Sequence, residues 1–74
     1  MRKEERMSLT EPQERVLSVI QSWQLKHGWS PTLREICAEI GVASPESARK
    51  HVDALVRKGY VERGRGARTL RAVW

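Results

Sequence analysis

Apolar residues recur every three or four positions in three stretches of the chain, and the first stretch predicts a long supporting helix. Its broad apolar face consists of Val16, Leu17, Val19, Ile20 and Trp23. Thr10 and Gln13 form a capping-box pattern before this face, and Gly28 follows it. Because a capping box begins helices and glycine ends them, we expect this helix to open at Thr10 and to reach Lys26 or His27.

The second stretch is shorter and has apolar residues at i, i+3, i+4 and i+7, namely Leu33, Ile36, Cys37 and Ile40. Thr32 with Glu35 supplies another capping box, and Gly41 supplies a left-handed stop. A helix from about Thr32 to Ile40 is therefore predicted. The preceding link, residues 29–31, should be extended because a residue before proline avoids helical geometry, and Trp29 is expected to cover the junction of helices and sheet.

The third stretch predicts a helix from Ser44 to Lys58 that stops at Gly59. Ser44 is a suitable cap, and Pro45 suits the first helical position, where an N–H has no helical partner. The inner stripe is Ala48, Val52, Leu55 and Val56. The residues expected to face outward are Glu46, Ser47, Lys50, Asp53, Ala54 and Arg57, with Arg49 and His51 on the flanks.

Two short antiparallel strands are predicted after the helices, at residues 60–63 and 69–73, joined through a glycine- and arginine-rich turn. The fold class is therefore mainly α with a small β part: three helices followed by a two-stranded antiparallel hairpin, the order of a winged helix-turn-helix. We expect one domain over residues 9–74 and a flexible N-terminal tail over residues 1–8. A helix-turn-helix with a wing has the shape that enters a DNA groove.

The charge of the chain is concentrated in its second half. Residues 1–41 hold six basic and six acidic side chains, whereas residues 42–74 hold eight basic and three acidic ones, so the net charge of +5 lies on the third helix and the hairpin. A soluble domain that is basic for no functional reason would more often spread its charge. Binding of a polyanion is the better explanation.

Other chemistry is poorly supported. The single cysteine, Cys37, lies in an apolar stripe and is expected to be a small buried side chain in a reducing compartment. His27 and His51 lack companions with metal-ligand spacing. The chain shows no catalytic constellation, nucleotide loop, signal peptide or membrane span. We expect no enzyme activity, cofactor, metal or membrane partner.

A family resemblance covers residues 9–73, and it rests on the order and spacing of several short motifs. These are Leu9-Thr10 with Gln13, then 28–36 (GWSPTLREI), 41–45 (GVASP), His51-Val52 with Ala54-Leu55, 57–61 (RKGYV) and 68–70 (RTL). In these motifs the sequence resembles the N-terminal DNA-binding domain of LexA-type repressors.

The resemblance implies a winged helix-turn-helix whose helix 44–58 lies in the major groove of double-stranded DNA. Family members bind two-fold symmetric operators as dimers and repress DNA-damage-response (SOS) genes. It further implies a prokaryotic or phage protein of the cytoplasm that associates with the nucleoid, with a possible homodimer on DNA.

Carried over position by position, the family's base or near-base contacts fall on Ser44, Glu46, Ser47, Arg49 and Lys50. Each has a simpler alternative: Ser44 is first a helix cap, Glu46 complements the helix dipole, and Arg49 or Lys50 contacts a phosphate or nothing. The expected DNA-binding set also includes Thr32, Arg34 and Arg57.

The hairpin adds Arg63, Arg65 and Arg68 to the expected DNA contacts. Arginines flanked by glycines suit a narrow minor groove or the phosphate backbone, with Arg65 at the predicted tip. The alternative is a solvated hairpin whose charges prevent edge-to-edge aggregation.

Two departures from the family pattern affect the functional expectation. Full-length members continue into a peptidase domain that cuts its own linker and supplies most of the dimer contact; these 74 residues contain none of it, so we expect no self-cleavage. Arg49 and Lys50 are basic where some members have acids, which favours guanine acceptors over cytosine donors. The main hypothesis is a sequence-specific transcriptional repressor; the alternative is a protein-interaction module, an antirepressor or partner of a host regulator, with Trp74 in its contact surface.

Overall fold

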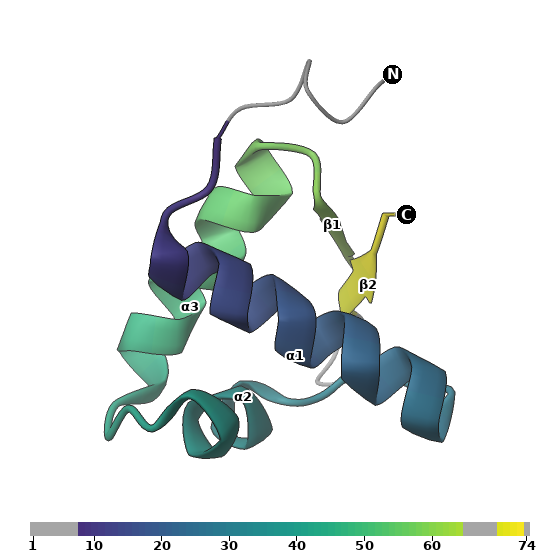
Figure 1. Ribbon diagram of the computed structural model, residues 1–74, viewed down its shortest axis with the longest axis horizontal. Coiled ribbons are helices and arrows are strands. Elements are labelled where there is room, and N and C mark those ends of the chain that lie inside the picture. The colour runs from purple at the N-terminus through teal and green to yellow at the C-terminus, as the bar shows by residue number, and fades with distance from the viewer. Residues whose placement is uncertain (1–7, 65–69, 74) are drawn as a thin grey trace.

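Three helices followed by a two-stranded antiparallel hairpin form the fold, as predicted (Figure 1). The computed structural model describes residues 8–64 and 70–73. Its elements are α1 (Glu11–His27), α2 (Leu33–Ile40), α3 (Pro45–Arg57), β1 (Val61–Arg63) and β2 (Leu70–Ala72). Residues 1–7 of the predicted tail, the hairpin tip with Arg65 and Arg68, and Trp74 lie outside the described residues. Within the described part, no helix combines the length and apolar character needed to cross a bilayer.

The helices begin and end where the capping residues predicted. Thr10 accepts a hydrogen bond from the Gln13 N–H at 3.4 Å, and Gln13 Oε1 accepts from the Thr10 N–H at 3.1 Å. Thr32 and Glu35 make the same reciprocal pair at 3.2 and 2.8 Å. After α1 and α2 the chain turns through left-handed glycines, with φ of 82° and 79°. Local chemistry alone therefore sets both boundaries of each helix.

Replacing Thr32 with alanine is expected to lower the free energy of unfolding by about 1 kcal/mol, because the Glu35 N–H loses its acceptor at the start of α2. For a domain of this size the loss corresponds to a drop of roughly 4–8 °C in Tm. Thermal unfolding followed by circular dichroism measures it. Thr32→Ser keeps the hydroxyl and is the matched control; equal Tm values for the two variants would contradict the capping contribution.

The core is formed where the inner faces of all three helices meet the hairpin. Fully buried side chains come from each helix and from the first strand, and the largest are Val16, Ile20, Ile36, Val52, Leu55 and Val61. In Figure 1, α1 crosses in front of α3, α2 lies below α1, and the hairpin packs beside α1. Cys37 is buried within this cluster, as predicted.

The hairpin is attached to the helices through α1. β1 and β2 pair in the register Val61 to Ala72 and Arg63 to Leu70. Gln24 Oε1 on α1 accepts a hydrogen bond from the Ala72 N–H at 2.6 Å. A backbone donor on the outer edge of β2 is thereby satisfied by a side chain of the supporting helix.

The prediction for Trp29 was wrong. Its side chain is 53% exposed and stacks on His27, with ring centroids 5.6 Å apart. Trp23 is half-buried and also contacts that imidazole, with ring centroids 4.8 Å apart. Ser30 and Pro31 are the buried residues of the link instead. The sequence pattern marks the extended link but does not show which of its side chains points inward.

Candidate nucleic-acid interface

The turn between α2 and α3 fixes the start of α3. The Gly41 N–H donates to the Cys37 carbonyl at 2.9 Å, and the Cys37 thiol donates to the Ser44 carbonyl at 3.4 Å. Ser44 then caps α3, its hydroxyl accepting from the Glu46 N–H at 3.3 Å. These contacts hold the first turn of α3 at a set position relative to α2.

The end of α3 is fastened to the start of α1. Lys58 Nζ donates to the Ser8 carbonyl at 2.9 Å and to Gln13 Oε1 at 2.8 Å, joining segments 45 or more residues apart in sequence. Ala54 precedes Lys58 by one turn on the same face, and it is only 5% exposed. The prediction that Ala54 faces outward was therefore wrong, because this flank of α3 packs toward the start of α1.

The opposite face of α3 is open to solvent and carries most of the predicted DNA-contact residues. The exposed members are Ser44, Glu46, Arg49, Lys50 and Arg57, and Ser47 is half-buried. Arg34 is exposed near the start of α2, and Thr32, which caps that helix, is half-buried. Within residues 8–64 and 70–73, no ion pair engages Arg49, Lys50 or Arg57. Their charges are available to an external anion.

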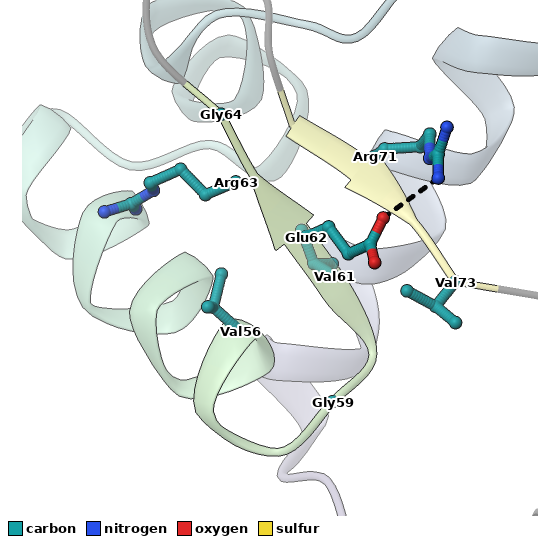
Figure 2. A pocket seen from close by; sticks show the side chains of 8 residues that line it. All are labelled: Val56, Gly59, Val61, Glu62, Arg63, Gly64, Arg71 and Val73. Atoms are coloured by element: carbon teal, nitrogen blue, oxygen red, sulfur yellow. Dashed lines mark hydrogen bonds and ion pairs between the residues drawn. The ribbon is translucent and has the colours of Figure 1, made fainter.

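Arg63, at the end of β1, differs from these cations because its side chain is engaged in an ion pair. Its guanidinium forms an ion pair with the Asp53 carboxylate on α3, with the nitrogen and oxygen 2.7 Å apart. Figure 2 shows Arg63 extending from the strand toward α3, whereas Glu62 and Arg71 lie on the other side and pair with each other at 3.0 Å. The structure thus places one predicted DNA-contact residue in contact with α3 itself.

An open groove separates the end of α3 from the hairpin, lined by Val56, Gly59, Val61, Glu62, Arg63 and Arg71 among others (Figure 2). Among the described residues, no group of three or more histidine, cysteine, aspartate or glutamate side chains is placed to hold a metal ion. The charged outer face of α3 is the main candidate site, because its cations Arg49, Lys50 and Arg57 are exposed.

Comparison with known families agrees with this geometry. The sequence model described as the LexA DNA binding domain matches residues 6–69, which is most of the chain. The chain belongs to the LexA DNA-binding-domain family. The helix-turn-helix and the first strand of this LexA-type domain lie within the matched range, as do all the residues predicted to contact DNA.

Individual relatives of the LexA-type domain show the same similarity. It is 41% identical to the LexA repressor of Desulfatibacillum aliphaticivorans over 58 residues, which is 78% of the chain and 29% of that protein. It is 42% identical over 60 residues to the LexA repressor of Halorhodospira halophila, covering 81% and 26% of the two chains. For the Burkholderia mallei LexA repressor the identity is 41% over 61 residues, covering 82% and 28%. The chain thus spans less than a third of the length of these relatives.

Sequence reasoning missed the Asp53–Arg63 pair of the LexA-type domain. The two residues are ten positions apart and on different elements, so no helical or strand spacing links them. A usable signal did exist, since an acid on a DNA-facing surface needs a cytosine donor or a neighbouring cation. Applied to Asp53, that rule would have directed attention to the nearby basic residues.

Proposed function

We propose that this domain binds double-stranded DNA sequence-specifically and acts as a transcriptional repressor, with α3 in the major groove. The observation that carries the proposal is the outer face of α3, where Arg49, Lys50 and Arg57 are exposed. On the inner face, Ala48, Val52 and Leu55 are fully buried. Membership of the LexA DNA-binding-domain family supports it, as do relatives named as repressors.

The dimensions and rigidity of α3 suit this task. Its 13 residues give a rod about 20 Å long, and the major groove, about 12 Å wide, admits a helix. Base readout is favoured when the helix that carries the contact side chains is already fixed before DNA arrives, because ordering that helix on binding would cost entropy. The contacts from Cys37 at one end and Lys58 at the other provide that fixed presentation.

The proposed contacts divide into two groups by chemistry. Base-edge contacts are assigned to Glu46, Ser47, Arg49 and Lys50 near the start of α3, where side chains reach deepest into the groove. Phosphate contacts are assigned to Thr32, Arg34, Ser44, Arg57 and, in the hairpin, Arg65 and Arg68. Arg63 is left out of both groups because its guanidinium is engaged by Asp53.

Two copies on a two-fold symmetric operator complete the proposal. A single module of this size buries about 600–1,000 Å² on DNA, which gives modest affinity. Paired half-sites about one helical turn apart let two domains bind the same face of the duplex. Occupation of a promoter by the pair would block transcription.

Selection of DNA from a random pool, followed by a salt titration, tests the proposed function. We expect the selected fragments to share a palindrome. Binding to such a fragment should weaken with salt at a slope of about −0.9 per phosphate neutralised by a cationic side chain, or roughly −7 for the four phosphate-contacting arginines in each of two bound copies. Fluorescence anisotropy of labelled duplexes measures this slope. Failure to bind any duplex at moderate salt would instead indicate a protein-interaction module.

A further inference from the structure

The Asp53–Arg63 pair joins the candidate DNA-contact helix to the base of the wing, and neither side chain is buried. The side chain of Arg63 is 38% exposed and that of Asp53 is 48% exposed, with 2.7 Å between Nη2 and Oδ1. Exposed pairs of this kind contribute little to folding stability. A role in binding therefore explains the Asp53–Arg63 pair better than a role in folding stability does.

Strand geometry explains why Arg63 reaches α3. Side chains alternate along a strand, so Arg63 points to the same side of the sheet as Val61, which is buried in the core. Leu70, opposite Arg63 on β2, still belongs to the core, but Arg63 lies at the end of β1 and its long side chain extends toward α3 (Figure 2). Glu62, between them, points the other way and pairs with Arg71.

Asp53 lies between the cationic side chains of α3 that are proposed to contact DNA. It follows Arg49 by four residues and Lys50 by three, and it precedes Arg57 by four, so all share one side of α3. A duplex carries one negative charge per about 1.7 Å of its length. An unpaired carboxylate at this position would meet phosphates of like charge.

We infer that Arg63 acts on Asp53 rather than on DNA: its guanidinium neutralises the Asp53 carboxylate at the centre of the contact face, so that α3 can approach the duplex. Arg63 is thus a positioning residue for binding, and the pair stays closed in the complex. The inference rests on the proposed function, since it concerns how the same face of α3 tolerates an acid. It predicts that the pair, taken together, adds no net charge to the interface.

Four proteins test the inference: the parent chain, Arg63→Gln, Asp53→Asn and the double variant. Thermal unfolding first establishes that all four fold. Binding to a selected duplex is then measured across a range of salt concentrations. We expect Arg63→Gln to bind about tenfold more weakly, because a like charge now faces the phosphates. Asp53→Asn should bind more tightly than the parent, because Arg63 is released. The double variant should match the parent in affinity within about twofold and in salt slope.

A phosphate contact by Arg63 would give a different result. The double variant would then lose affinity, and its salt slope would be smaller in magnitude by about 0.9 per bound copy than that of the parent. Either that result or an unchanged affinity for Arg63→Gln would overturn the inference. Glu62→Gln combined with Arg71→Gln is the matched control, because this pair lies on the other side of the sheet from α3. We expect that the double substitution restores no DNA affinity that either single substitution loses.

The same binding measurements distinguish a failure of the proposed function from a failure of the inference about Arg63. If the parent chain itself ignores duplex DNA, the proposed function fails. If the parent binds with a strong salt dependence and the double variant does not match it, only the assignment of Arg63 fails.

Discussion

Replacing Leu55 with alanine is expected to lower the free energy of unfolding by about 3 kcal/mol. Leu55 is fully buried where α3 meets the rest of the core, and truncating a buried leucine removes its transfer energy and leaves a cavity. In a domain of this size the loss corresponds to a Tm about 15 °C lower. Because the total stability of small domains is only about 5 kcal/mol, we expect a sizeable unfolded population at 37 °C. Urea unfolding followed by tryptophan fluorescence measures the change.

Leu25 provides a control of the same residue type. Its side chain is 76% exposed on α1, so Leu25→Ala should change the free energy of unfolding by less than about 0.5 kcal/mol. Similar losses for the two variants would mean that Leu55 is not packed as the structure shows.

Replacing Lys50 with alanine is expected to reduce discrimination between selected and random duplexes by about 1–3 kcal/mol, equivalent to a factor of about 5–150. Lys50 is exposed on the outer face of α3, one turn beyond Glu46, where a side chain can meet a base edge. Competition anisotropy with selected and random duplexes measures the ratio.

Lys26→Ala is the matched control, because Lys26 is exposed on the last turn of α1 and outside the helix-turn-helix. It should leave the ratio unchanged. If Lys50→Ala weakens binding to selected and random duplexes equally, Lys50 contacts only phosphate, and the base-edge assignment is wrong.

Residues that act on their close neighbours in sequence allowed most of the fold to be predicted. Thr10 and Thr32 cap helices through bonds that span three residues, so four-residue patterns reveal them. Gly28 and Gly41 end helices through their own backbone conformation. The apolar positions of α1 and α2 follow from the helical period, and Ile20 and Ile36 are both fully buried.

Features that depend on packing between distant elements were not predictable in this way. Ala54 lies on the outer side by helical period, yet it is only 5% exposed. Lys58, one turn further along the same flank, bonds to Gln13 at the start of α1. The exposure of Trp29 depends on how the link crosses the core. The ion pair of Arg63 depends on how close the end of β1 lies to Asp53 on α3, which no spacing along the chain reveals. The contact residues on α3 stay predictions, since their partner is another molecule.

The two ends of α3 are held by Cys37 and Lys58, and its inner stripe fills the core. Side chains such as Arg49 and Lys50, which are exposed on the outer face, therefore contribute little to maintaining the architecture. Exchanging them should retarget the domain to other operators at little thermodynamic cost, because surface substitutions usually change stability by less than about 0.5 kcal/mol. In this domain, recognition can diverge while the scaffold is conserved, provided that any acid introduced beside the phosphates brings its own counter-charge.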